Sequence, residues 1–182
     1  WSIFIAFAVM ALKFVAWQMT GSVALYSDAL ESIVNVIAAS AAFWAISVSQ
    51  KPADRDHQYG HHKAEYFSAV LEGVLIVVAA LLILAEVWRT FQNYAPLEHA
   101  WQGFAVNALA AVVNGVWATI LIRTGRRHKS PALEADGRHI MTDVVTSFGV
   151  LAGLIGAVLT GWYILDPLLA MLVALNILYQ GW

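Results

Sequence analysis

The stretch HIMTDVVTSFGVLAGLIGAVLT, residues 139–160, decides the fold class of this chain. As a helix it is long enough to cross a bilayer, which takes about 20 mainly apolar residues. The whole chain has the same character, since 60% of its residues are hydrophobic, only 12% are charged and its mean hydropathy is +0.69. We therefore expect an all-α membrane protein.

Six apolar runs of this kind predict a six-transmembrane-helix bundle that fills residues 1–182 as a single domain. Lys and Arg gather in the loops after the second and fourth runs, and positive loops stay on the cytoplasmic side of a membrane. We therefore expect both termini to be cytoplasmic. The chain has no basic stripe that would indicate a nucleic acid, and no cysteine for disulfides or thiolate metal sites. The approximate bounds of the runs are 1–20, 23–48, 64–92, 99–123, 135–160 and 163–182.

Polar residues inside the predicted spans form two matching stripes. His139 and Asp143 are four residues apart and share a helix face, and Asp28, Glu31 and Asn35 form a second stripe on the second predicted helix. Ionisable groups in hydrocarbon are costly, but a bound cation compensates buried carboxylates. The stripes thus predict a divalent-cation site, with helix capping and hydrogen bonding between helices as the alternatives.

The loop after the second predicted helix holds another candidate site. Its sequence DRDHQYGHHKAE includes Asp54, His57 and His61, and a four-residue His spacing flanked by aspartate suits a metal ion. Exposed His and Asp in a loop are often only solvated, and this is the alternative for the pattern.

Three segments together resemble the cation diffusion facilitators, a family of proton-coupled exporters of divalent metals. They are TGSVAL at the first turn, PADRDHQYGHHKAE after the second helix and EADGRHIMTD at the start of the fifth. The resemblance covers the whole chain and implies a homodimer in the lipid bilayer. It also implies a cytoplasmic C-terminal domain, which residues 1–182 do not include.

The resemblance implies a transport site made of Glu31, Asn35, His139 and Asp143. The His-x-x-x-Asp half on the fifth helix is the form found in zinc-transporting members. The second helix departs from the family pattern, because Asn35 stands where a charged Asp is usual. Asp28, one turn earlier, is a further candidate ligand that could supply the missing charge, or it could cap the helix instead.

By the same resemblance, Asp54, His57 and His61 form a cytoplasmic loop metal site. Lys63 and Glu65 match a family pair at the start of the third helix that helps to pack the dimer or couple the domains. Ordinary interfacial snorkelling would also explain these two residues.

These expectations combine into one function. We predict a proton-coupled exporter of divalent cations, zinc first and otherwise iron(II), cobalt, cadmium or manganese, in the inner (plasma) membrane of a bacterium. A metal-binding membrane scaffold or sensor without flux is the alternative. We do not expect an enzyme, because the chain lacks an H-E-x-x-H pair and a cysteine nucleophile.

Overall fold

The computed structural model describes residues 2–50, 63–92 and 96–180, and the chain is helical through most of these ranges. The predicted all-α fold with six helices is confirmed. Five of the helices are long and apolar enough to cross a membrane, whereas α6 is shorter. The helices are α1 (Ser2–Thr20), α2 (Val23–Ser49), α3 (Lys63–Gln92), α4 (Ala100–Arg127), α5 (Pro131–Thr160) and α6 (Leu165–Gln180).

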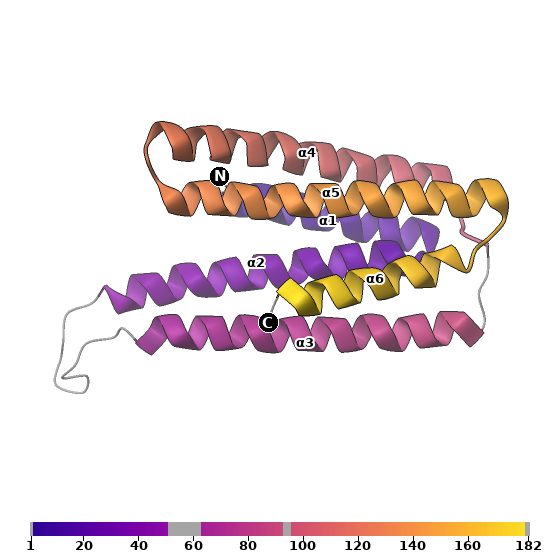
Figure 1. Ribbon diagram of the computed structural model, residues 1–182, viewed down its shortest axis with the longest axis horizontal. Helices are drawn as coiled ribbons and strands as arrows, with labels where there is room; N and C mark the ends of the chain where they lie inside the picture. The colour runs from indigo at the N-terminus through magenta and orange to yellow at the C-terminus, as the bar shows by residue number, and fades with distance from the viewer. Residues whose placement is uncertain (1, 51–62, 93–95, 181–182) are drawn as a thin grey trace.

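The helices run roughly along one axis and form two groups (Figure 1). One group contains α1, α4 and α5, and the other contains α2, α3 and α6. We call the end where α2 and α4 end and α3 and α5 begin the loop end, at the left of Figure 1, and the opposite end the far end. Consecutive helices run in opposite directions, so each end of the bundle contains the last turns of some helices and the first turns of others.

The hydrophobic core lies toward the far end. It includes Leu25 at the start of α2, Phe104 at the start of α4 and Leu154 in the second half of α5, all nearly inaccessible to solvent. Dispersion contacts and burial of apolar surface hold the two helix groups together there. The bundle is therefore tightly packed at one end.

A polar clasp reinforces the same end. The Asp166 carboxylate at the start of α6 accepts hydrogen bonds from Ser22 Oγ at 2.6 Å and from the backbone N–H groups of Val23 and Ala24, each at 2.9 Å. Ser22 is also the N-cap of α2, accepting from the N–H of Leu25. The first backbone N–H groups of α2 have no partner within the helix. They donate instead to Ser22, directly before the helix, and to Asp166, far along the chain.

The connection between α4 and α5 differs from the sequence expectation. We predicted that the charged segment RTGRRHKSPALEADGR, residues 123–138, connects the two helices as a loop, but the two helices take up most of it. Pro131 fits the first turn of α5, where no N–H is needed. Glu134 accepts hydrogen bonds from Arg126 at 3.2 Å and Arg138 at 2.7 Å, so the charges pair on helical surfaces. The many charged residues of this segment suggested a loop. In the structure they form ion pairs on helical surfaces, and α4 and α5 extend into the segment.

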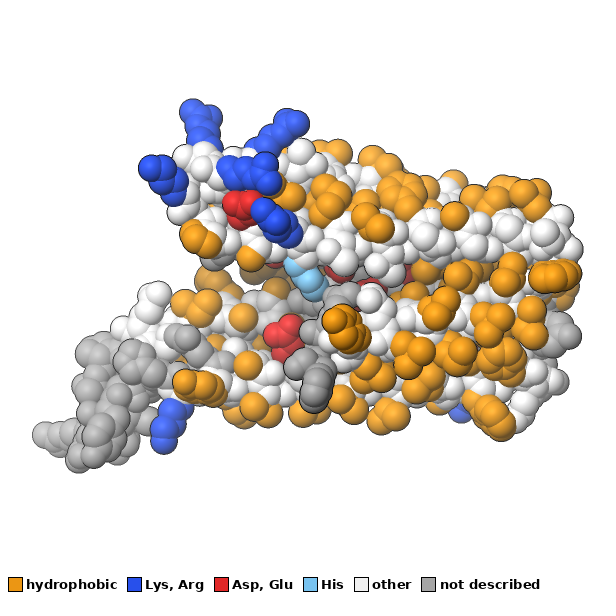
Figure 2. All heavy atoms as spheres, viewed as in Figure 1, with side chains coloured by type: hydrophobic (Ala, Val, Ile, Leu, Met, Phe, Trp, Pro, Cys, Tyr) orange, Lys and Arg blue, Asp and Glu red, His pale blue; other side chains and the backbone are white. Residues whose placement is uncertain are grey.

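The outer surface of the bundle is strongly apolar. Phe4, Leu81 and Val145 are 72%, 61% and 67% exposed, and hydrophobic side chains are spread over the visible face in Figure 2. A water-soluble protein rarely exposes apolar patches of this extent. These faces meet lipid, and the protein is a multi-pass membrane protein.

Candidate metal site

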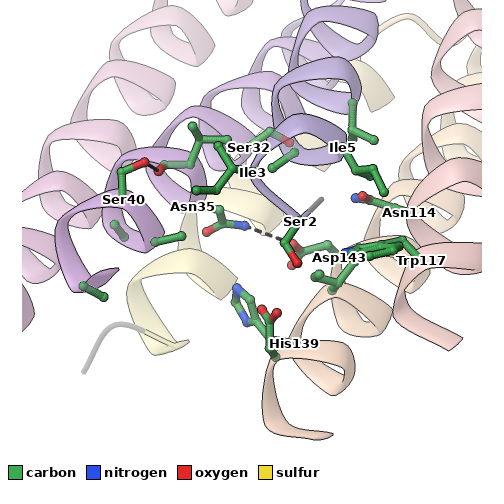
Figure 3. Close-up of a pocket in the computed structure, with 18 of the residues that line it drawn as sticks. Ser2, Ile3, Ile5, Ser32, Asn35, Ser40, Asn114, Trp117, His139 and Asp143 are labelled. Atoms are coloured by element: carbon green, nitrogen blue, oxygen red, sulfur yellow. Dashed lines mark hydrogen bonds between the residues drawn. The ribbon is translucent and has the colours of Figure 1, made fainter. Parts of the chain in front are cut away.

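The two predicted stripes do meet in space. Asn35 of α2 donates a hydrogen bond from Nδ2 to Asp143 Oδ2 of α5 at 2.9 Å (Figure 3). Asp143 lies ten residues after Leu133, where the apolar span of α5 begins, so it is about 15 Å into the span along the helix axis. The structure thus links the two helices at the depth where an intramembrane site was expected.

Two carboxylate oxygens at this place have no partner among the residues that the structure describes. Glu31 Oε2 and Asp143 Oδ1 are buried and make no hydrogen bond within the described part of the chain. The two side chains are only 5% and 6% exposed. Buried polar groups are normally satisfied, and an unsatisfied buried carboxylate is especially costly. Each orphan oxygen is therefore a candidate ligand atom for a cation.

Two neighbouring cavities open beside these oxygens. The larger has a volume of about 280 Å³ and is lined by Asn35, His139 and Asp143 together with residues of α1 and α4. The smaller, of about 180 Å³, is lined by Glu31, Asn35 and His139 together with residues of α3 and α6. Glu72 of α3 also lines both. All four predicted site residues therefore border this space.

The larger cavity lies in a cleft between the two helix groups. Figure 2 shows this cleft at the loop end, with a histidine side chain and an acidic side chain at its margins. In Figure 3, His139 and Asp143 from α5 and Asn35 from α2 face one another across the cavity. His139 itself is exposed, and water entering the cleft can reach it.

The ligands are not gathered into a finished coordination sphere. Among the residues that the structure describes, no three His, Asp or Glu side chains are close enough together to hold one metal ion. Zinc requires ligand atoms at about 2.0–2.2 Å from the metal. A cation binding here would have to draw the α2 and α5 halves closer together.

Asp28 has a different environment from the other stripe residues. Its Oδ1 accepts from Lys13 Nζ at 2.6 Å and from Ser147 Oγ at 2.9 Å, and its Oδ2 accepts from Asn107 Nδ2 at 3.2 Å. Lys13 and Asp28 are each 1% exposed. Asp28 does not cap α2, since Ser22 does. It joins α2 to α1, α4 and α5 instead.

The other predicted site residues can be placed only in part. Lys63 is the first residue of α3, as expected, and is exposed. Glu65 lies in the same first turn, but its side chain is outside the description. The predicted loop ligands Asp54, His57 and His61 lie outside the described residues.

Sequence reasoning did not single out two polar residues that matter here. Ser147 follows Asp143 by four positions on the α5 face, and this spacing was a readable signal. Asp166 precedes Pro167 at the start of the last helix, a common N-terminal pattern, but its contact with α2 could not be read from spacing.

Comparison with known proteins agrees with the geometry. The chain is 48% identical over 180 residues to the uncharacterized transporter sll1263 of Synechocystis sp., covering 99% of this chain and 58% of that protein. It is 31% identical to the cation-efflux pump FieF of Shewanella oneidensis, covering 99% of this chain and 60% of that protein. FieF of Klebsiella pneumoniae is 30% identical over 97% of this chain and 58% of its own length.

The chain therefore spans about three fifths of the curated relatives it matches. The family of the cation efflux transmembrane domain matches residues 1–182, the whole of this sequence. With six helices and paired polar stripes in the membrane, the chain belongs to the cation efflux family of transporters, the cation diffusion facilitators.

Proposed function

We propose that this chain is the membrane domain of an antiporter that exports divalent cations in exchange for protons. One observation carries the proposal: Glu31 Oε2 and Asp143 Oδ1 are buried beside cavities lined by His139 and have no hydrogen-bond partner among the described residues. Unpaired carboxylate oxygens beside an imidazole form a donor set suited to a transition-metal dication.

The charge balance supports a divalent cargo. Lys13 neutralises Asp28, and this leaves the charges of Glu31 and Asp143 without a cationic partner in the described network. One dication compensates two ionised carboxylates. We assign the cargo site to Glu31, Asn35, His139 and Asp143 and leave Asp28 out, because binding there would displace Lys13.

The donor types rank the possible metals. A histidine nitrogen favours zinc, iron(II), cobalt or cadmium over magnesium and calcium, which prefer oxygen ligands alone. The amide of Asn35 can turn its oxygen toward a cation but brings no charge. Zinc is our first candidate, and manganese is the least favoured of the cations considered because the site contains an imidazole.

The shape of the bundle supports a direction of access. The cleft opens at the loop end, whereas the core and the Asp166 clasp close the far end. Exposed basic side chains gather at the loop end, with Arg89 near the other, and positive residues mark the cytoplasmic side. We infer that both termini are cytoplasmic and that this conformation admits a cation from the cytoplasm.

Proton coupling follows from the chemistry of the ligands. Protonation of His139 or of either carboxylate removes the lone pair that would bind the metal, so metal and protons compete for the same atoms. If the site then opens at the far end, protons from outside displace the metal. If the site opens alternately to the two sides of the membrane, the competition between metal and protons becomes an exchange of one for the other.

Inside-out vesicles that contain the full-length protein test this proposal. We expect zinc to accumulate in the lumen and to do so faster when the lumen is more acidic, while vesicles with Asp143→Ala show no accumulation. Accumulation that ignores the pH gradient would exclude proton coupling. Zinc binding without any accumulation would favour the scaffold or sensor alternative.

Three further features remain proposals. They are a loop metal site at Asp54, His57 and His61, a homodimer in the inner membrane, and a coupling role for Lys63 and Glu65. The matched relatives are longer than this chain, which supports a further domain in the whole protein.

A further inference from the structure

Glu72 is an acidic residue inside the membrane span of α3 that the proposed site does not use. It lies six residues after Tyr66, where the apolar span begins, or about 9 Å along the helix axis. An ionisable side chain at such a depth is costly unless it faces water or a partner. Glu72 lines both cavities, so it faces the aqueous space.

The carboxylate of Glu72 is free to bind a ligand. Within the described ranges it makes no hydrogen bond and no ion pair. Glu86, fourteen residues later on the same helix, lies 3.5 Å from Arg89. The two glutamates share a helix face but differ in position and partner, which makes Glu86 a matched reference.

The smaller cavity brings Glu72 together with the proposed cargo ligands. Its wall contains Glu31 and Asn35 from α2, Glu72 from α3 and His139 from α5, and Ile76 and Ile177 supply apolar surface. Glu31 Oε2, which is buried and has no hydrogen-bond partner in the described part of the chain, belongs to the same wall. Two carboxylates and an imidazole from three helices therefore border a space of about 180 Å³.

We propose that Glu72 is an additional ligand for the divalent cation, acting with Glu31 and His139. It supplies from α3 the negative charge that Asn35 does not bring to α2. Because no three ligands are within metal-binding distance in the described residues, this set forms as the cation enters and the helices close around it. The inference rests on the proposed transport function and extends its site to a third helix.

The test compares zinc affinity in the purified full-length protein, measured by calorimetry, with zinc transport in vesicles. Glu72→Gln keeps the size of the side chain and removes its charge. We expect this change to weaken zinc binding about 10-fold to 100-fold, in the range seen when groups supporting a metal site are removed. Glu86→Gln should leave zinc affinity unchanged.

A second variant tests the idea that Glu72 replaces a charge missing from α2. Adding Asn35→Asp to Glu72→Gln returns a carboxylate to the site, and we expect zinc affinity to recover most of its loss. Thermal unfolding of each variant provides the check that the fold is intact.

The outcomes separate the two proposals. If the unaltered protein transports zinc and Glu72→Gln binds it as tightly as before, Glu72 is not a ligand, although the transport proposal stands. Equal losses in Glu72→Gln and Glu86→Gln would mean a general effect of acidic residues and would also overturn the inference. If the unaltered protein neither binds nor transports zinc, both proposals fail.

Discussion

Asp28 and Glu31 lie one helical turn apart on α2, and both are buried, yet their surroundings are opposite. Asp28 receives three hydrogen bonds, one of them from the ammonium group of Lys13. Glu31 borders a cavity and has a buried oxygen with no hydrogen-bond partner within residues 2–50, 63–92 and 96–180. In a membrane, a fully satisfied carboxylate can stabilise helix packing, whereas an unsatisfied one signals a site for a cation.

The comparison assigns separate tasks to neighbouring charges. The pair formed by Lys13 and Asp28 is electrically balanced and connects α1 to α2, while Ser147 and Asn107 extend the connection to α5 and α4. In our proposal, Glu31 and Asp143 bind the cargo. The predictions below test this division from the largest expected effect to the smallest.

The largest effect is expected from the α5 half of the site. His139→Ala or Asp143→Ala should abolish zinc transport without unfolding the protein, because each removes a proposed ligand that no neighbour on that face replaces. Zinc flux into vesicles, together with the thermal unfolding midpoint, checks both points. Transport retained by both variants would place the cargo site elsewhere.

Breaking the balanced pair should affect stability first. Lys13→Met leaves the Asp28 charge buried and uncompensated, so we expect the free energy of unfolding to fall by about 3–5 kcal/mol. The double variant Lys13→Met with Asp28→Asn removes both charges and should regain most of that loss. Reversible unfolding in mixed detergent micelles measures the difference.

Arg89→Met is the matched control, because Arg89 belongs to an exposed pair with Glu86. Exposed pairs contribute at most about 1 kcal/mol, so this change should be small. A Lys13→Met protein that is as stable as Arg89→Met would contradict the structural role of the buried pair.

A moderate effect is expected when a charge is added to the cargo site. Asn35→Asp should keep transport and tighten zinc binding by about 10-fold, since a further carboxylate joins the proposed donors. The added group must lose its proton before it binds metal, so zinc affinity should fall more steeply as the pH is lowered. Zinc titrations at several pH values measure both effects, and unchanged affinity would mean that Asn35 is not at the cargo site.

The smallest effect on flux is expected from the loop. His57→Ala combined with His61→Ala should reduce the transport rate only in part, because the proposed cytoplasmic loop site would lie outside the proposed translocation path. The initial rate of zinc uptake at saturating zinc measures this effect. Complete loss of flux in a correctly folded double variant would reverse the ranking of the two sites.

The sequence predicted the helices well because apolar length is a local property. The spacing of His139 and Asp143 likewise predicted a shared face, and the Asn35–Asp143 hydrogen bond confirms that the two stripes meet. The role of Asp28 could not be predicted, because three polar residues at helical spacing on one stripe look alike until their partners are known. Lys13 and Ser147 reach Asp28 from helices whose rotation depends on packing throughout the bundle.

The position of Glu72 beside the cavities could likewise be seen only in the structure. The spacing of Glu72 and Glu86 indicates a common helix face. Only the structure shows that Glu72 lines the cavities, whereas Glu86 pairs with Arg89. The loop-end extension of α4 and α5 was missed for a related reason. Dense charge looks like a solvated loop until Glu134 is seen to pair with Arg126 and Arg138 on helices.

The most direct test of this account is to locate the metal in a crystal structure of the full-length protein loaded with zinc, using anomalous scattering at the zinc edge. We predict a peak about 2.0–2.2 Å from ligand atoms of His139 and Asp143, with Asp28 still bound to Lys13. A zinc peak on Asp28 with Lys13 displaced, or zinc bound by neither His139 nor Asp143, would contradict the division between the balanced pair and the cargo site.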